Sequence, residues 1–296
     1  MEKFADIQSL LKEYYDLEFP VSIFQLADFL QNYPEEGMWD LSTIRVSPSG
    51  ILSLILNPKL LTENFKESAL LHYRYYRDLP EFFTYLHGDC DGLHWGLLLD
   101  NPSIGFRGAA SYYNNDGDKI QVYGSIFSAL IDRCEEQLEC CDEYLAEDGD
   151  EYYLEAKSII NRFLERIQDY ISKYSIEIVE NRVETVSSDT GLGLCVPEKF
   201  RRNELSKVYS KSSDEGYKAL LDECTDGNVV PALKAGRSLW YWGGEEDSEK
   251  AYNLLKKAYT VLQREKLLHI LEIHYNNRDI KSVDMTGYPK RLSFER

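Results

Sequence analysis

Apolar residues recur at helical spacing in the first part of the chain, over residues 7–15 and 22–31, with a Phe-Pro break between them. Two apolar runs then flank the turn Ser47–Gly50, which predicts a β-hairpin over residues 39–56. Between residues 73 and 123, runs of strand length alternate with short polar turns. Strands joined in this way favour an antiparallel sheet.

The periodicity becomes helical after residue 123. The ranges that we expect to be helical are 125–144, 153–174, 199–221, 230–242 and 248–275. An acidic run, 147–151, separates the first two helices and is a candidate boundary. The pattern predicts an α+β fold in two parts: residues 1–146, an α+β domain with an antiparallel sheet, and residues 152–296, a mainly helical domain.

The negative net charge of the chain disfavours some classes of binding partner. A formal net charge of −18 weighs against direct binding to nucleic acid, which requires clustered Lys and Arg. It weighs against a membrane surface for the same reason. An acidic surface suits a basic protein partner such as a histone tail, although acidity is more often only a source of solubility.

Cysteine and histidine spacing argues against a metal or redox site. None of the six cysteines forms a CxxC pair, and the five histidines are dispersed. The first thirty residues contain acids throughout and lack the apolar block of a secretory signal. Reduced thiols in an intracellular protein are therefore the economical interpretation.

The stretch LDECTDGNVVPALKAGRSLWYWGG holds the best candidate for chemistry. Two adjacent carboxylates, Asp222 and Glu223, precede a glycine-containing turn and an apolar run that is typical of a buried helix. One interpretation is that these acids only stabilise a helix start, where the helix dipole favours negative charge. The other is a catalytic carboxylate, and the residues alone leave both open.

Familiar motifs of self-contained enzymes are absent from the sequence. It has no GxSxG elbow and no Walker-type loop, and Gly191-Leu192-Gly193 lacks the third glycine of a dinucleotide fingerprint. His94, beside Trp95, is best explained as a structural histidine of the core. We therefore do not expect a complete active site within this chain.

Two groups of motifs, in order along the chain, resemble the histone PARylation factor family. The first runs from Tyr73 through Pro80-Glu81-Phe82 to His94-Trp95-Gly96 and Asp100-Asn101-Pro102. The second is Asp222-Glu223-Cys224, followed by Gly236, Leu239-Trp240-Tyr241-Trp242-Gly243 and, near the end, Asn277-Arg278. The resemblance spans roughly residues 73–284.

This resemblance implies an accessory factor that completes the active site of an ADP-ribosyltransferase of the PARP type. Glu223, with Asp222 beside it, would be the general base that deprotonates an acceptor serine, and such assistance is typically worth about 10²–10⁴-fold. NAD would be supplied through the partner enzyme and not bound stably here. The compartment would be cytoplasmic for a bacterial protein and nuclear for a eukaryotic one.

The expected partner-binding residues are Arg201, Arg202, Trp240 and Trp242. The family carries an arginine in this region that grips the polymerase, and Gly191–Pro197 contains none, so the two arginines are the nearest substitutes. The alternative is a non-catalytic binding module of the Smi1/Knr4 (immunity-protein) type, which the run Leu79–Phe83 resembles. The cofactor hypothesis predicts a solvent-reachable Glu223, whereas the binding-module hypothesis makes no such demand.

Overall fold

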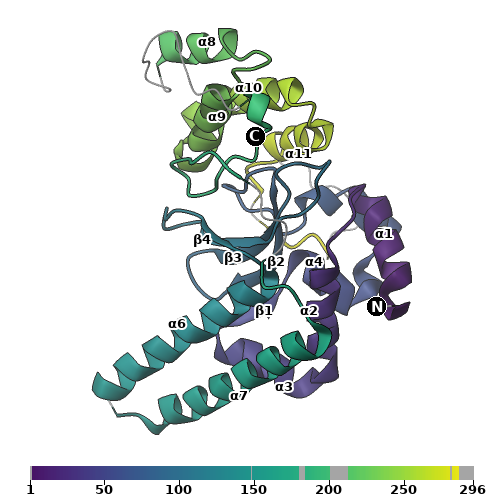
Figure 1. The fold of residues 1–296 in the computed structure, drawn as a ribbon, viewed down its shortest axis with the longest axis vertical. Coiled ribbons are helices and arrows are strands. Elements are labelled where there is room, and N and C mark those ends of the chain that lie inside the picture. Colours follow the sequence, from purple (N-terminus) through teal and green to yellow (C-terminus); the bar gives the residue numbers. More distant parts are fainter. Residues whose placement is uncertain (1, 148, 180–183, 201–212, 281, 287–296) are drawn as a thin grey trace.

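An antiparallel sheet forms the centre of the N-terminal half, with its five strands in sequence order (Figure 1). The computed structural model describes residues 2–147, 149–179, 184–200, 213–280 and 282–286. The strands are β1 (Val46–Pro48), β2 (Phe82–Gly88), β3 (Leu93–Leu98), β4 (Ala109–Tyr113) and β5 (Gln121–Tyr123). Every neighbouring pair is antiparallel, which confirms the predicted sheet and the α+β class.

The predicted hairpin over residues 39–56 is wrong. This region forms α3 (Pro34–Thr43), the short β1, and α4 (Gly50–Leu56), and β1 pairs with β2 instead. The run after Gly50 is buried on nearly all sides, and a short apolar run of this kind does not reveal its period. Gly50 itself has φ +43, and a Cβ there would lie 2.0 Å from the Thr84 carbonyl oxygen.

Helices surround this sheet and extend from it. The predicted first two helices are confirmed as α1 (Ala5–Tyr15) and α2 (Val21–Asn32). Short segments follow α4, namely η2 (Pro58–Leu60), α5 (Glu63–Lys66) and η3 (Ala69–Leu71), and η1 (Glu2–Phe4) precedes α1.

Two long helices, α6 (Ile126–Glu147) and α7 (Glu151–Tyr174), form a hairpin that projects from one end of the molecule (Figure 1). Asp150 caps α7 by accepting a hydrogen bond from the Tyr152 amide at 2.9 Å. The buried face of α7 packs on α2, where the Tyr170 hydroxyl donates to Asp28 at 2.7 Å. Helix α7 therefore packs with the N-terminal half, although the sequence-based division placed it in the second part.

The C-terminal half is helical. Its elements are η4 (Glu198–Phe200), α8 (Asp214–Asp222), α9 (Val230–Trp242), η5 (Glu245–Asp247), α10 (Ser248–Val261) and α11 (Glu265–Tyr275). The single helix expected over residues 248–275 is broken at Leu262–Arg264, where Gln263 has φ +56. Helices α9 and α10 pack closely because Gly236 has no side chain. A Cβ added at this position would lie only 2.9 Å from Leu255 Cγ.

Helix α9 joins the two halves. The Trp240 indole donates to the Asp78 carbonyl at 2.8 Å, and the Tyr241 hydroxyl donates to the Asp118 carbonyl at 2.6 Å. Both acceptors belong to loops of the sheet-containing half. Within the described ranges, no helix has the length and apolar character that crossing a bilayer requires.

Candidate functional site

Asp222 and Glu223 lie at the end of α8, at the extremity of the molecule farthest from the α6–α7 hairpin (Figure 1). Asp222 is the last residue of the helix and is exposed, whereas Glu223 is the C-cap and is half-buried. The Glu223 amide donates to the Ala219 carbonyl at 2.9 Å, which fixes the backbone that carries both carboxylates. Their presentation therefore depends on regular helix geometry and not on a loose loop.

This position corrects the interpretation of the two acids as residues of a helix start. The next helix, α9, begins only at Val230, so the acids belong to the C-terminal end of α8. At that end the helix dipole opposes negative charge, at a cost of about 0.3–1 kcal/mol for each exposed carboxylate. Helix stabilisation consequently does not explain why two acids stand there.

The turn after Glu223 is anchored on both sides. Cys224 is buried, and burial raises the pKa of its thiol to about 11, so the thiol is neutral at physiological pH and is no nucleophile. The Asn228 side-chain amide donates to the Glu223 carbonyl at 3.4 Å, and Gly227 supplies the positive φ of +95 that the turn needs. Pro231 then lies in the first turn of α9, a position that favours proline.

The predicted partner-binding residues do not gather around this turn. Trp240 is fully buried, with the Arg278 guanidinium 3.9 Å above its ring, so it is a core residue in this structure. Trp242 is 38% exposed but ends α9, about 18 Å along the axis from its first residue. Arg201 and Arg202 lie outside the described residues.

His94 belongs to a buried polar cluster. One ring nitrogen, Nε2, lies 3.0 Å from an Asp78 carboxylate oxygen that also accepts the Tyr112 hydroxyl at 2.6 Å. Tyr75 stacks on the imidazole with a centroid separation of 4.0 Å. No serine or cysteine appears among the hydrogen-bond partners described for this ring. His94, Asp78 and Tyr112 are all buried, so the structural interpretation of His94 fits these contacts.

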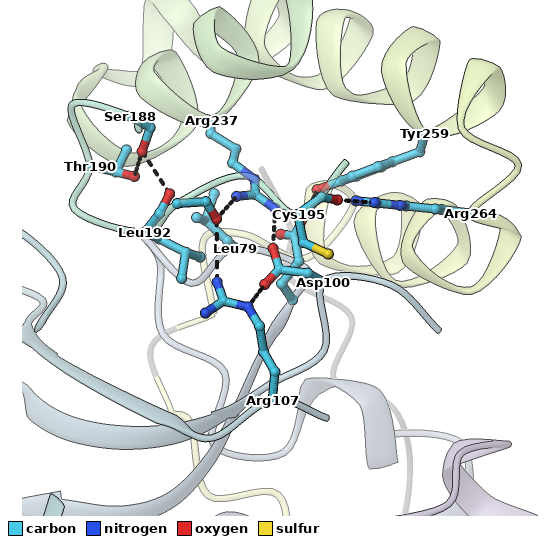
Figure 2. A network of polar contacts seen from close by, with 12 residues as sticks. Leu79, Asp100, Arg107, Ser188, Thr190, Leu192, Cys195, Arg237, Tyr259 and Arg264 are labelled. Atoms are coloured by element: carbon cyan, nitrogen blue, oxygen red, sulfur yellow. Dashed lines mark hydrogen bonds and ion pairs between the residues drawn. The ribbon is translucent and has the colours of Figure 1, made fainter. Parts of the chain in front are cut away.

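A larger ionic cluster, centred on Arg237 of α9, lies between the two halves (Figure 2). Its Nη2 donates to Glu81 at 2.6 Å and to Asp100 at 2.8 Å, and all three side chains are essentially inaccessible to solvent. Arg107 also pairs with Asp100, and the Tyr259 hydroxyl donates to Glu81 at 2.5 Å. The cluster holds α9, and thus the turn before it, against the sheet-containing half.

The pKa values follow from this geometry. Burial alone would raise the pKa of Asp100, but Arg237 and Arg107 more than offset it and hold that pKa below its usual range. Burial likewise disfavours the charged Arg237, yet Glu81 and Asp100 raise its pKa. Sequence reasoning missed this cluster, and the available signal was an arginine within the otherwise apolar run of α9, because a buried cation requires anionic partners.

Within the described part of the chain, no group of three or more His, Cys, Asp or Glu side chains is arranged to hold a metal ion. The family model described as Histone PARylation factor 1 matches residues 6–222, well over half of the chain. The chain belongs to the histone PARylation factor 1 family. Membership supports a role like that of a histone PARylation factor.

The family match also bears on the candidate site. It covers α8 up to Asp222 and ends one residue before Glu223. The matched range includes the sheet, the α6–α7 hairpin and both acidic members of the Arg237 cluster. In this histone PARylation factor family member, the role of Glu223 therefore has to be argued from the geometry of the turn.

Proposed function

We propose that this protein completes the active site of an ADP-ribosyltransferase and supplies Glu223 as the general base for modification of serine. In the shared site, the Glu223 carboxylate takes the proton of the acceptor hydroxyl. The serine oxygen bonds to the ribose carbon of NAD, and the bond from that carbon to nicotinamide breaks. A serine hydroxyl is a weak nucleophile, and a positioned carboxylate is a common activator.

The observation that carries the proposal is the placement of two carboxylates at the C-terminal end of α8. The helix dipole disfavours negative charge at this position, main-chain hydrogen bonds fix it, and it lies at an extremity of the molecule. Acidic side chains held on a rigid backbone at a position that the helix dipole disfavours are expected where a side chain serves a function. The family match supports an ADP-ribosylation role for the protein as a whole.

Charge supports the choice of substrate. Asp222 is exposed beside Glu223, and the chain as a whole carries a formal net charge of −18. An acidic surface raises the local concentration of basic segments such as histone tails. The transferase partner would contribute the NAD pocket that completes the shared site.

The test adds the protein to a poly-ADP-ribose polymerase with NAD and a serine-containing histone peptide. The wild type is expected to increase serine modification, and Glu223→Gln to reduce that increase by about 10²–10⁴-fold. Glu215→Gln is the matched control, because Glu215 is an exposed glutamate in the first turn of the same helix. It should behave as wild type.

Binding must be measured alongside chemistry. If Glu223 is the base, Glu223→Gln should co-purify with the polymerase as wild type does while losing activity. Full activity of Glu223→Gln would refute the general-base role. The alternative of a Smi1/Knr4-type module has no support among the described residues beyond the Leu79–Phe83 run, and we do not pursue it.

A further inference from the structure

A cavity of about 810 Å³ opens where the two halves of the molecule meet. Its described walls are the loop 101–103, the α10–α11 junction 261–266, Asp226 of the turn that follows Glu223, and the residues Pro197, Lys199 and Phe200. The volume lies within the range of roughly 300–1,000 Å³ typical of sites for small molecules and cofactors, and such sites favour junctions between structural units.

The cavity is lined by more cations than anions, in a chain that is strongly acidic overall. Lys199, Arg264 and Lys266 face two acids, Asp226 and Glu265. These two acids are exposed. The lysine ammonium groups are carried on flexible stems and can turn toward a ligand. The cavity is therefore a local positive region that would attract an anion.

Arg264 is the strongest sign of a missing partner. The side chain is only 3% exposed, and its Nη2 donates to the Cys195 carbonyl (Figure 2). Its Nη1 is buried and has no hydrogen-bond partner within the described part of the chain. Burial, and next the nearby Arg237, lower the pKa of Arg264, and the neighbouring Asp100 and Glu81 offset only part of that effect. An anion at this wall would satisfy the open donor.

Beside the polar Asn101, Ser103 and Gln263, the remaining lining includes an apolar surface. Pro102, Phe200, Val261 and Leu262 contribute it, and the Lys199 ammonium lies 4.4 Å from the centre of the Phe200 ring. Cations and an apolar surface thus occur side by side. This combination suits a ligand that carries both phosphates and a flat, weakly polar group.

Lys266 already pairs with Asp16 of α1, at a site where both side chains are substantially exposed. Exposed ion pairs of this kind contribute little, so the pair does not prevent Lys266 from turning to a multiply charged anion.

We propose that this cavity binds a small phosphorylated ligand of the nucleoside diphosphate class. The diphosphate would contact Arg264, Lys199 and Lys266, and the base would pack against the apolar surface formed by Phe200 and Leu262. Asp226 and Glu265 would accept hydrogen bonds from the ribose hydroxyls. This proposal does not depend on the general-base role of Glu223, since it concerns different side chains.

The test uses the full-length protein, with binding of ADP followed by calorimetry and by thermal shift. ADP is expected to raise the midpoint temperature of thermal unfolding. Lys199→Glu is expected to weaken the binding of ADP at least about tenfold, because it removes a charge-assisted contact. Ser103→Trp would fill the cavity from its exposed loop and should abolish binding. Lys173→Glu, at the exposed end of α7, is the control and should bind as wild type.

Two further ligands test recognition of the phosphates and recognition of the nucleoside separately. Inorganic pyrophosphate and adenosine should each bind much more weakly than ADP. Pyrophosphate equal to ADP would overturn the nucleoside part, and adenosine equal to ADP would overturn the anion contact. No thermal shift and no heat at millimolar ADP, or full binding by Ser103→Trp, would overturn the assignment of this cavity.

Discussion

Replacing Arg237 with methionine is the sharpest test of how the two halves are held together. Met has a similar length but carries no charge, so Arg237→Met leaves Glu81 and Asp100 buried at 0–1% side-chain exposure without their shared cation. Breaking a buried ion pair by removing one partner typically costs about 3–5 kcal/mol. Arg107 and Tyr259 still contact the two carboxylates, so we expect the lower end, about 3 kcal/mol.

Chemical denaturation and thermal unfolding provide the measurement. For a chain of 296 residues, an entropy of unfolding of about 2.1 cal/mol/K per residue makes a loss of about 3 kcal/mol correspond to a fall in the midpoint temperature of roughly 5 °C. Arg162→Met is the matched control, since Arg162 lies exposed on α7, and it should change stability by no more than about 0.5 kcal/mol.

A triple variant isolates the cause. Combining Arg237→Met with Glu81→Gln and Asp100→Asn removes the uncompensated charges, and it should recover part of the loss caused by the single change. The reasoning would be refuted if Arg237→Met lost less than about 1 kcal/mol, or if the triple variant were the less stable of the two.

Two further predictions concern the N-terminal half. Burial lowers the pKa of His72 to about 4, against about 6.5 when unfolded, so the unfolded state binds the extra proton and stability falls as pH drops from 6.5 toward 4. From pH 8 to pH 5 this amounts to about 2 kcal/mol. His72→Asn, which can still accept from the Met285 amide, should flatten that part of a stability–pH curve, and an unchanged slope would contradict the assignment. In β3, Gly96→Ala places a Cβ 2.2 Å from the Phe82 ring and should cost about 1–3 kcal/mol in denaturant unfolding; a neutral effect would show that Phe82 can move aside.

Local patterns along the chain predicted much of the fold. The strands over residues 82–123 and helix α9 at Val230–Trp242 follow from runs of apolar residues bounded by turn residues, because such boundaries depend on neighbours in sequence. The predicted hairpin at residues 39–56 failed for the opposite reason. A run that is buried on all sides has no polar face, so its conformation depends on what surrounds it.

The sequence likewise predicted some features of the candidate site and missed others. The sequence alone identified Asp222 and Glu223 as an unusual pair before a turn, and it identified the family that the comparison confirms. It could not show that they end α8 and do not begin α9, because helix ends depend on capping and packing that span several segments.

The amino-acid sequence thus determined the secondary structure wherever a local period was visible, together with the acidic character of the chain and its family. The tertiary structure alone decided that Trp240 is a core residue, that Arg237 joins two acids more than 130 positions away, and that a cationic cavity lies beside the Glu223 turn. The physical reason is that burial and ion pairing arise between residues distant in sequence. A residue's own neighbours along the chain carry little information about them.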